Sequence, residues 1–264
     1  MRIFYNNTEI TKQIDRLDTI NYALTYTTGN YIYIASDFPF NQLYIKLGAV
    51  VNAISTSMTV EYLADGWTSV AELRDETSAL STSGNIEFTP NRNSSWKRTT
   101  DSSEAGLTTV VYYKYWTRIS FASDLTAAVL LSFMGNKFSD VSDLFDEYPV
   151  FDDAAFLSAF KTSKTTWEEQ HIKAAVQIVA DLQRKNIIVA PEQILERKRF
   201  IGASVCKCAE IIFTSFGNDY IEQRKAAKEE YSKRLDLSQY SIDKNNNAIL
   251  EIEEKTAKQG WLYR

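Results

Sequence analysis

The sequence has little of what most enzymes use for acid–base or metal chemistry. Its 264 residues include one histidine, His171, and two cysteines, Cys206 and Cys208. Histidine is the commonest general base, and a nucleophile needs such a base within hydrogen-bond reach. The patterns GxSxG, HExxH and GxxxxGK[ST] are absent. We therefore expect that the chain is not an enzyme and has no cofactor, with glycosidase chemistry by carboxylates alone as the enzymatic alternative.

Long apolar segments are missing as well. No stretch approaches the roughly 18 consecutive apolar residues that span a bilayer, and the opening MRIFYNNTEITKQ contains no apolar signal-peptide core. We expect a soluble, non-secreted protein with no membrane partner. Cys206 and Cys208 stand two positions apart in a helical pattern, so their side chains point to different sides and reduced structural thiols are expected.

The charge is modest and unevenly distributed. A formal net charge of -5 is typical neither of a nucleic-acid-binding polycation nor of a disordered acidic tail. Residues 1–150 carry 11 Lys/Arg against 17 Asp/Glu, whereas residues 151–264 carry 18 against 17. The first half is therefore the acidic half. Basic clusters in the second half interleave with acids, which is typical of a solvated helix face.

Residues 30–133 show short β-branched and aromatic runs separated by turn residues, a pattern typical of an antiparallel sandwich. Met58, Val60 and Tyr62 alternate with polar residues, as a strand with one dry face requires. We predict about seven strands, at residues 31–36, 42–51, 57–63, 69–73, 85–90, 110–121 and 127–134.

The pattern becomes helical after the polar, acidic segment 135–149, which we interpret as the join between two domains. Thr166 and Glu169 have capping-box spacing, and an apolar stripe beginning at Trp167 continues until Asn186 ends the helix. Pro191 is a good first-turn residue for a second helix. The predicted helices span 166–186, 191–216, 219–235 and 250–258.

The sequence therefore predicts an α+β protein of two domains, which agrees with a length prior of roughly 100 to 200 residues per domain. Residues 1–148 are predicted to form an antiparallel β-sandwich. Residues 149–264 are predicted to form an all-α domain of about three to five helices.

Aromatic residues make up 13% of the chain and crowd into one predicted strand. A two-layer sandwich has one dry face per sheet, so rings on the other face are exposed or covered by a partner. We favour a covering partner, as in an assembly subunit, with a carbohydrate-binding sandwich as the alternative. The crowded residues are Tyr112, Tyr113, Tyr115 and Trp116.

One segment has the spacing of a helix-loop-helix calcium site. The candidate ligands fall at loop positions 1, 3, 5, 9 and 12. Position 6, normally glycine, is Ala248, and asparagine in place of aspartate lowers the charge of the loop. We favour a polar turn rich in Asp and Asn over a calcium site. The candidate calcium ligands are Asp243, Asn245, Asn247, Glu251 and Glu254.

Several segments resemble virion proteins of tailed bacteriophages. GWTSVAELRDETSALSTSGNIEFTPNRNSSWKR (66–98), followed by YYKYWTRISF (112–121), is similar to β-sandwich modules of tail and connector components. Two later segments resemble the helical body of head-to-tail connector proteins, also called adaptors. They are TTWEEQHIKAAVQIVADLQRKNIIVAPEQIL (165–195) and ASVCKCAEIIFTSFGNDYIEQRKAAKEEYSKRL (203–235).

This resemblance implies a homo-oligomeric ring in the virion, between the portal protein and the tail. Helices 166–235 would pack side by side around the ring, and DNA would pass through its channel without sequence-specific binding. The last residues would contact a neighbouring subunit or the portal: Trp261, Leu262, Tyr263 and Arg264. The large sandwich departs from the minimal adaptor, so another tail, collar or baseplate protein, or a glycan-binding module on a helical stalk, stays open.

Overall fold

The computed structural model describes residues 1–14, 21–92, 95–99, 107, 113–126, 128–162, 164–237 and 240–249. The chain forms two compact units. The sheet unit comprises residues 1–135 and 243–249, and the helical unit comprises residues 136–242 and 250–264. The predicted α+β class, sheets first and helices second, is confirmed.

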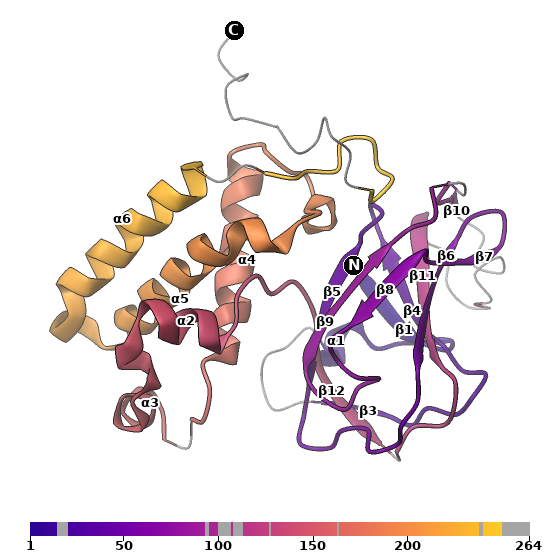
Figure 1. The fold of residues 1–264 in the computed structure, drawn as a ribbon, viewed down its shortest axis with the longest axis horizontal. Helices are drawn as coiled ribbons and strands as arrows, with labels where there is room; N and C mark the ends of the chain where they lie inside the picture. Colours follow the sequence, from indigo (N-terminus) through magenta and orange to yellow (C-terminus); the bar gives the residue numbers. More distant parts are fainter. Residues whose placement is uncertain are drawn as a thin grey trace, which may run out of the picture. The chain divides into compact units, whose positions relative to one another are not determined.

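The sheet unit contains two antiparallel sheets in its described part (Figure 1). Sheet A runs in the order β2-β1-β4-β11-β6-β7, with β10 paired to β11, and sheet B in the order β3-β12-β5-β9-β8. Sheet A consists of β1 (Arg2–Tyr5), β2 (Thr8–Glu9), β4 (Ile32–Ser36), β6 (Met58–Leu63), β7 (Trp67–Ser69), β10 (Arg98–Thr99) and β11 (Lys114–Phe121). Sheet B consists of β3 (Tyr22–Leu24), β5 (Gln42–Leu47), β8 (Glu72–Asp75), β9 (Gly84–Thr89) and β12 (Val129–Gly135). A short helix, α1 (Thr11–Ile14), belongs to this unit.

The two sheets share one apolar core, as a sandwich requires. Ile34 of β4 and Val60 of β6 belong to the same buried cluster as Ile45 of β5 and Leu131 of β12. The alternation predicted for β6 is confirmed, because Met58, Val60 and Tyr62 are all buried whereas Thr59 is exposed. Burial of these side chains on both inner faces is what holds the sheets together.

The predicted strand 69–73 is wrong. Its residues divide between β7 of sheet A and β8 of sheet B, so the segment crosses from one sheet to the other. This segment resembles a strand in sequence because Val70 and Leu73 are apolar, and both pack against the core of the sandwich at the crossing. Four short strands, β1, β2, β3 and β10, were not predicted.

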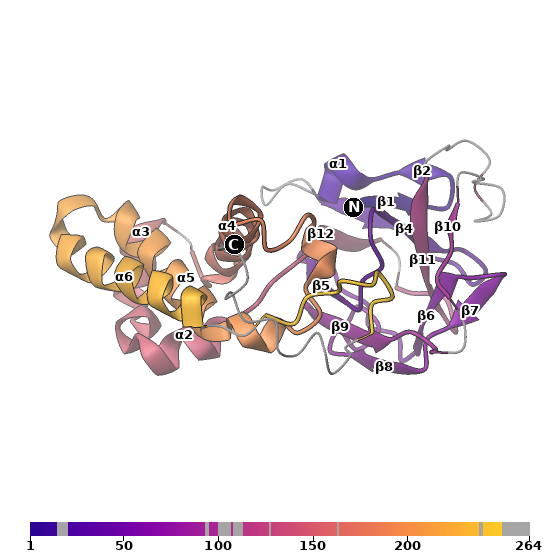
Figure 2. The same ribbon diagram turned by 90° about the horizontal axis from the view of Figure 1, so that it is seen from above.

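The helical unit contains five α-helices among its described residues: α2 (Val141–Glu147), α3 (Ala154–Phe160), α4 (Glu168–Arg184), α5 (Ile201–Ser215) and α6 (Ile221–Leu237). Short 3-10 helices span Pro149–Asp152, Pro191–Gln193, Arg197–Phe200 and Gly217–Tyr220. α5 packs against both α4 and α6 (Figures 1 and 2). No helix in the described part of the chain is both long and apolar enough to cross a membrane.

The apolar stripe of α4 is confirmed. Trp167, which precedes the helix, and the four stripe residues within it are all buried, and Asn186 adopts a left-handed φ of 54° just after the helix ends. The buried stripe residues are Ala174, Ala175, Ile178 and Leu182. α6 buries Ala227, Tyr231 and Leu235 at the spacing of one helical face.

Two helix boundaries and the domain boundary differ from the prediction. The second long helix begins at Ile201 and not at Pro191, because residues 191–200 form 3-10 turns instead. The Thr166–Glu169 capping box does not form, although Thr166 accepts a hydrogen bond from the Glu168 N–H (3.3 Å). The helical unit begins at Asn136 and not after residue 148, because α2 packs on α5. The predicted helix 250–258 lies outside the described residues.

Gly84 tests how closely the sheet unit is packed. A Cβ at this position would lie 2.6 Å from the Glu76 carbonyl oxygen, whereas a Cβ at Gly66 would meet nothing within 4 Å. We expect Gly84→Ala to lower the free energy of unfolding by about 1–3 kcal/mol, since backbone must move. Gly66→Ala, the matched control, should change it by no more than about 1 kcal/mol. Urea unfolding measures both, and equal effects would contradict this account.

Candidate functional site

A cavity of about 560 Å³ lies within the sheet unit, between the loop of residues 53–57 and the segment 73–81. Met58 and Ala79, both buried, contribute apolar surface to it. Four serines, Ser55, Ser57, Ser78 and Ser81, contribute hydroxyl groups. We call this feature the edge cavity, because β8, the last strand of sheet B, supplies part of its lining.

One wall of the edge cavity is a left-handed turn. Ser78, Ala79 and Leu80 have φ angles of 49°, 53° and 65° in succession. Left-handed backbone costs a non-glycine residue roughly 1–2 kcal/mol and usually occurs one residue at a time. Three in a row persist only where the surroundings hold them.

Asp75 holds this turn from its N-terminal side. Its Oδ1 accepts hydrogen bonds from the Thr77 N–H (2.7 Å) and the Thr77 hydroxyl (2.6 Å), and its Oδ2 accepts one from the Ala79 N–H (2.7 Å). The Thr77 hydroxyl oxygen accepts in turn from the Leu80 N–H (3.1 Å). These bonds satisfy donors that a left-handed turn leaves without a helical partner.

Asn52 fastens the opposite wall to the same turn. Its buried side-chain amide donates to the carbonyls of Ile54 (2.8 Å) and Ala79 (2.9 Å), and its backbone N–H donates to the Leu80 carbonyl (2.9 Å). Its Oδ1 accepts from the Thr126 N–H (3.1 Å). One residue therefore ties three loops together, which fixes the width of the edge cavity.

Apolar side chains are exposed next to this wall. Val50, Val51 and Ile54 are 40%, 37% and 42% exposed. Asp75 is the one charged residue among the described lining of the edge cavity, and its carboxylate accepts hydrogen bonds from the turn. The cavity lining therefore combines hydroxyl and backbone hydrogen-bonding groups with adjacent apolar surface. Such a lining suits the binding of a ligand.

The aromatic strand is covered in part by its own chain, and a covering partner for the rest stays a prediction. Trp116 is fully buried on the outer face of sheet A, where it packs with Phe4 (ring centroids 5.8 Å apart) and Leu107. Tyr113 is 53% exposed, beneath the Arg98 guanidinium. Tyr112 lies outside the described residues.

Arg118 on the same outer face is enclosed by aromatic rings. Its guanidinium lies 4.2 Å from the ring centre of Tyr31 and 4.5 Å from that of Trp67. Its Nε donates to a Glu61 carboxylate oxygen at 2.6 Å. This aromatic cage is therefore filled by the chain's own cation and is not a vacant sugar-binding platform.

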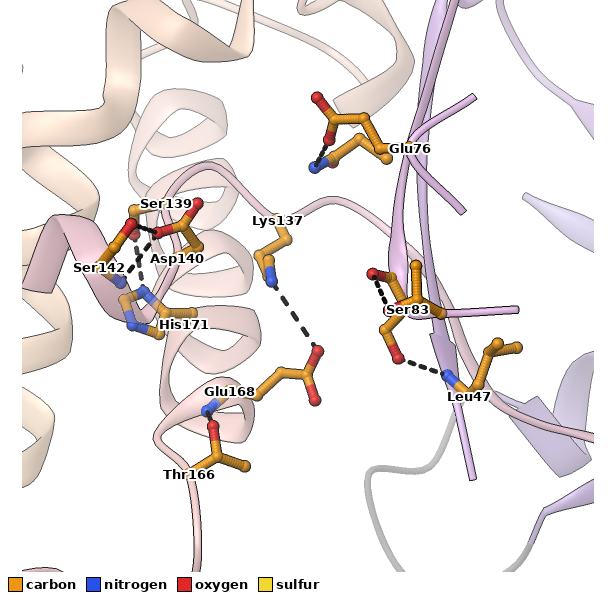
Figure 3. A network of polar contacts seen from close by, with 12 residues as sticks. Leu47, Glu76, Ser83, Lys137, Ser139, Asp140, Ser142, Thr166, Glu168 and His171 are labelled. Atoms are coloured by element: carbon orange, nitrogen blue, oxygen red, sulfur yellow. Dashed lines mark hydrogen bonds and ion pairs between the residues drawn. The ribbon is translucent and has the colours of Figure 1, made fainter. Parts of the chain in front are cut away.

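His171 lies in a buried polar cluster of the helical unit (Figure 3). Its Nδ1 lies 2.8 Å from the Ser139 hydroxyl, which is also 2.7 Å from the Ser204 hydroxyl. The His171 Nε2 has no hydrogen-bond partner among the described residues. Ser139 and His171 are 1% and 0% exposed, so a substrate has no access to this pair in this conformation.

Burial sets the charge state of two groups in this unit. Burial, helped by the Lys137 charge, lowers the pKa of His171 to about 3. Burial, helped by the Glu169 charge, raises the pKa of Glu168 to about 7, although Lys137 lies 3.8 Å from its carboxylate (Figure 3). An ion pair at 3.8 Å is loose, so the Lys137 charge lowers the pKa of Glu168 by less than burial raises it.

Both thiols are free and buried. Burial raises the pKa of Cys206 to about 11 and also raises the pKa of Cys208. Thiols that stay protonated are poor nucleophiles and poor metal ligands.

The candidate calcium loop is described only in its first half. Asp243 is buried, and its carboxylate accepts hydrogen bonds from the N–H groups of Asn247 (3.2 Å) and Ala248 (2.8 Å). This is the arrangement of a polar turn that uses its aspartate to hold the backbone. Within the part of the chain that the structure describes, no group of three or more His, Cys, Asp or Glu is placed to hold a metal. Glu251 and Glu254 lie outside the described residues, so calcium binding stays a prediction.

The predicted C-terminal contact residues Trp261, Leu262, Tyr263 and Arg264 also lie outside the described residues. The edge cavity was not predicted from the sequence. The Ser and Thr residues at 55–57 and 77–82 indicated turns, but nothing in their pattern indicated that the two turns face each other.

No family model, no curated protein and no solved structure matches this chain.

The two buried titratable groups predict opposing pH effects on stability. Because folding lowers the pKa of His171, this residue raises the free energy of unfolding above pH 6.5, and that contribution is lost as pH falls towards about 3. Because folding raises the pKa of Glu168, this residue raises the free energy of unfolding below pH 4.5, and that contribution is lost as pH rises through about 7. Each effect is on the order of a few kcal/mol.

Single variants should separate these effects. His171→Gln should leave a protein whose free energy of unfolding falls between pH 4.5 and pH 7, and Glu168→Gln one whose free energy rises between pH 3 and pH 6.5. Urea titrations of both variants at half-unit pH steps measure the slopes. Parallel pH curves for the two variants would show that the buried groups do not act in this way.

Proposed function

We propose that this chain is a structural virion protein of a tailed phage, a head-to-tail connector that forms a homo-oligomeric ring between the portal protein and the tail. The observation that carries the proposal is the order of the two units. A sheet sandwich precedes a bundle in which α5 packs on α4 and α6, in the same order as the segments that resemble tail or connector sandwich modules and the helical body of adaptors.

Exposed apolar side chains on both units support a role in assembly. Beside those of the 50–54 loop, the helical unit exposes Val150, Val176 and Val189 at 44%, 59% and 74%. α6 buries three residues on one face, and charged side chains occupy much of the rest of the helix. Surfaces of this kind suit contacts between subunits.

The arrangement of reactive groups favours assembly over turnover. Among the described residues, the one Ser–His pair, Ser139 with His171, is buried. The edge cavity presents serine hydroxyl groups, and its described lining contains no histidine or lysine. In the proposed role the chain acts by binding other subunits and virion proteins, within the virion.

Ring formation is the first measurement. The purified chain, alone at high concentration or mixed with a phage portal protein, should form rings that negative-stain microscopy resolves. A chain that stays monomeric under both conditions would contradict the proposal.

A matched pair of variants on α4 tests which surface assembles. Val176→Glu removes an exposed apolar side chain and adds a negative charge, whereas Gln177→Glu adds the same charge at the adjacent exposed position. We expect Val176→Glu to weaken association at least about tenfold and Gln177→Glu to change it little, since a desolvated charge opposes an apolar contact. Sedimentation velocity measures the association, and circular dichroism checks that both variants fold.

A further inference from the structure

β8 is an open edge of sheet B. In the described sheets it pairs only with β9. The Glu76 N–H donates to the Asn85 carbonyl at 2.9 Å, and hydrogen-bonded pairs alternate along antiparallel strands. The backbone of Arg74 therefore faces β9, and the N–H and C=O groups of Leu73 and Asp75 face away from it. The described residues give these outward groups no backbone partner.

The same two residues line the edge cavity. Leu73 and Asp75 therefore border a space of about 560 Å³, within the range of roughly 300–1,000 Å³ that ligand sites occupy. The opposite wall is held in place by Asn52. An unpaired strand edge beside a preformed space is the geometry that accepts an added strand.

The lining favours a peptide backbone over other ligands. The hydroxyls of Ser55, Ser57, Ser78 and Ser81 make no hydrogen bond with other described residues, so they can donate to carbonyls and accept from N–H groups. Among the described lining residues there is no lysine or arginine, which disfavours a phosphate. The same described residues include no aromatic ring on which a sugar could stack.

The charge around the edge favours a basic partner. Residues 72–76 and Glu87 together carry four carboxylates and one cation, Arg74. Arg74 pairs with Glu76 at 2.9 Å and with Glu87 at 3.8 Å, and the Glu72 side chain is exposed on the same strand. A strand bearing Lys or Arg would be attracted to this edge, and one bearing Asp or Glu would be repelled.

We propose that the edge cavity binds an extended, basic segment of another protein chain, which adds to β8 as an extra strand. Its backbone pairs with Leu73 and Asp75, an apolar side chain covers the exposed Ile54, and a lysine or arginine lies near Glu72. This site goes beyond the proposed connector function and does not depend on it, because peptide binding and ring formation are measured separately.

Three labelled peptides test the site on the full chain by fluorescence anisotropy. The first is TKVTVKT, the second TEVTVET, and the third TKVTVKT with N-methyl groups on alternate backbone amides. We expect the first to bind at least about tenfold more tightly than either of the others, since only it offers both positive charge and free N–H groups. Failure of TKVTVKT to bind would overturn the proposal, and equal binding by the N-methylated peptide would reduce it to charge attraction and overturn the added strand.

Two variants locate the binding. Glu72→Lys changes an exposed side chain and should weaken TKVTVKT about tenfold while strengthening TEVTVET. Leu73→Pro removes an N–H that faces away from β9 and should weaken TKVTVKT at least tenfold, with circular dichroism as the check on folding. Because Leu73 also packs on the core, Glu72→Lys decides the matter if the proline variant unfolds. Unchanged affinity of Glu72→Lys for TKVTVKT would overturn the site. If no peptide binds and Glu72→Lys abolishes self-association of the chain, the edge pairs with a second copy and the proposed basic segment is overturned.

Discussion

The backbone of an antiparallel sheet must be paired strand by strand, and the two end strands of an open sheet keep one unpaired side. This constraint shapes the sheet unit. Sheet A has β2 and β7 at its ends, and sheet B has β3 and β8. Natural proteins often blunt such edges with short strands and charge, and β8 is four residues long and rich in charge. β8 also borders the edge cavity, and its unpaired N–H and C=O groups are the groups that the proposed added strand would bind.

A strained left-handed turn forms one wall of the edge cavity, and side-chain hydrogen bonds hold that turn in place. The successive left-handed residues Ser78, Ala79 and Leu80 would be unstable alone, and Asp75 and Asn52 hold them with buried hydrogen bonds. Loss of the Asp75 side chain would leave the Thr77 and Ala79 N–H groups without their acceptor, and loss of the Asn52 side chain would leave the Ala79 carbonyl without its donor. An unsatisfied buried polar group is costlier than the loss of a surface contact. Backbone strain of this kind accumulates where a surface has to keep one shape.

The helical unit is organised differently, by apolar stripes that enclose a few polar groups. Ser139, His171 and Ser204 form a chain of hydrogen bonds from three segments of this unit, and burial keeps the imidazole neutral. Arg234 of α6 joins α2 through both Glu147 oxygens, at 2.6 and 2.7 Å. These polar links fix how the helices pack, whereas valines such as Val176 remain exposed.

The sequence by itself determined the fold class and much of the core. Alternation in β6 and the stripe of α4 are local periodicities, so Met58 and Ile178 could be assigned to the interior from spacing alone. The crossing of residues 69–73 between sheets, the start of α5 at Ile201 and the placement of α2 were decided by tertiary structure, because they depend on which distant segment supplies the partner surface. The edge cavity belongs to the same class. Asn52 and Ala79 are far apart in the chain, and only the sandwich brings them within hydrogen-bonding distance.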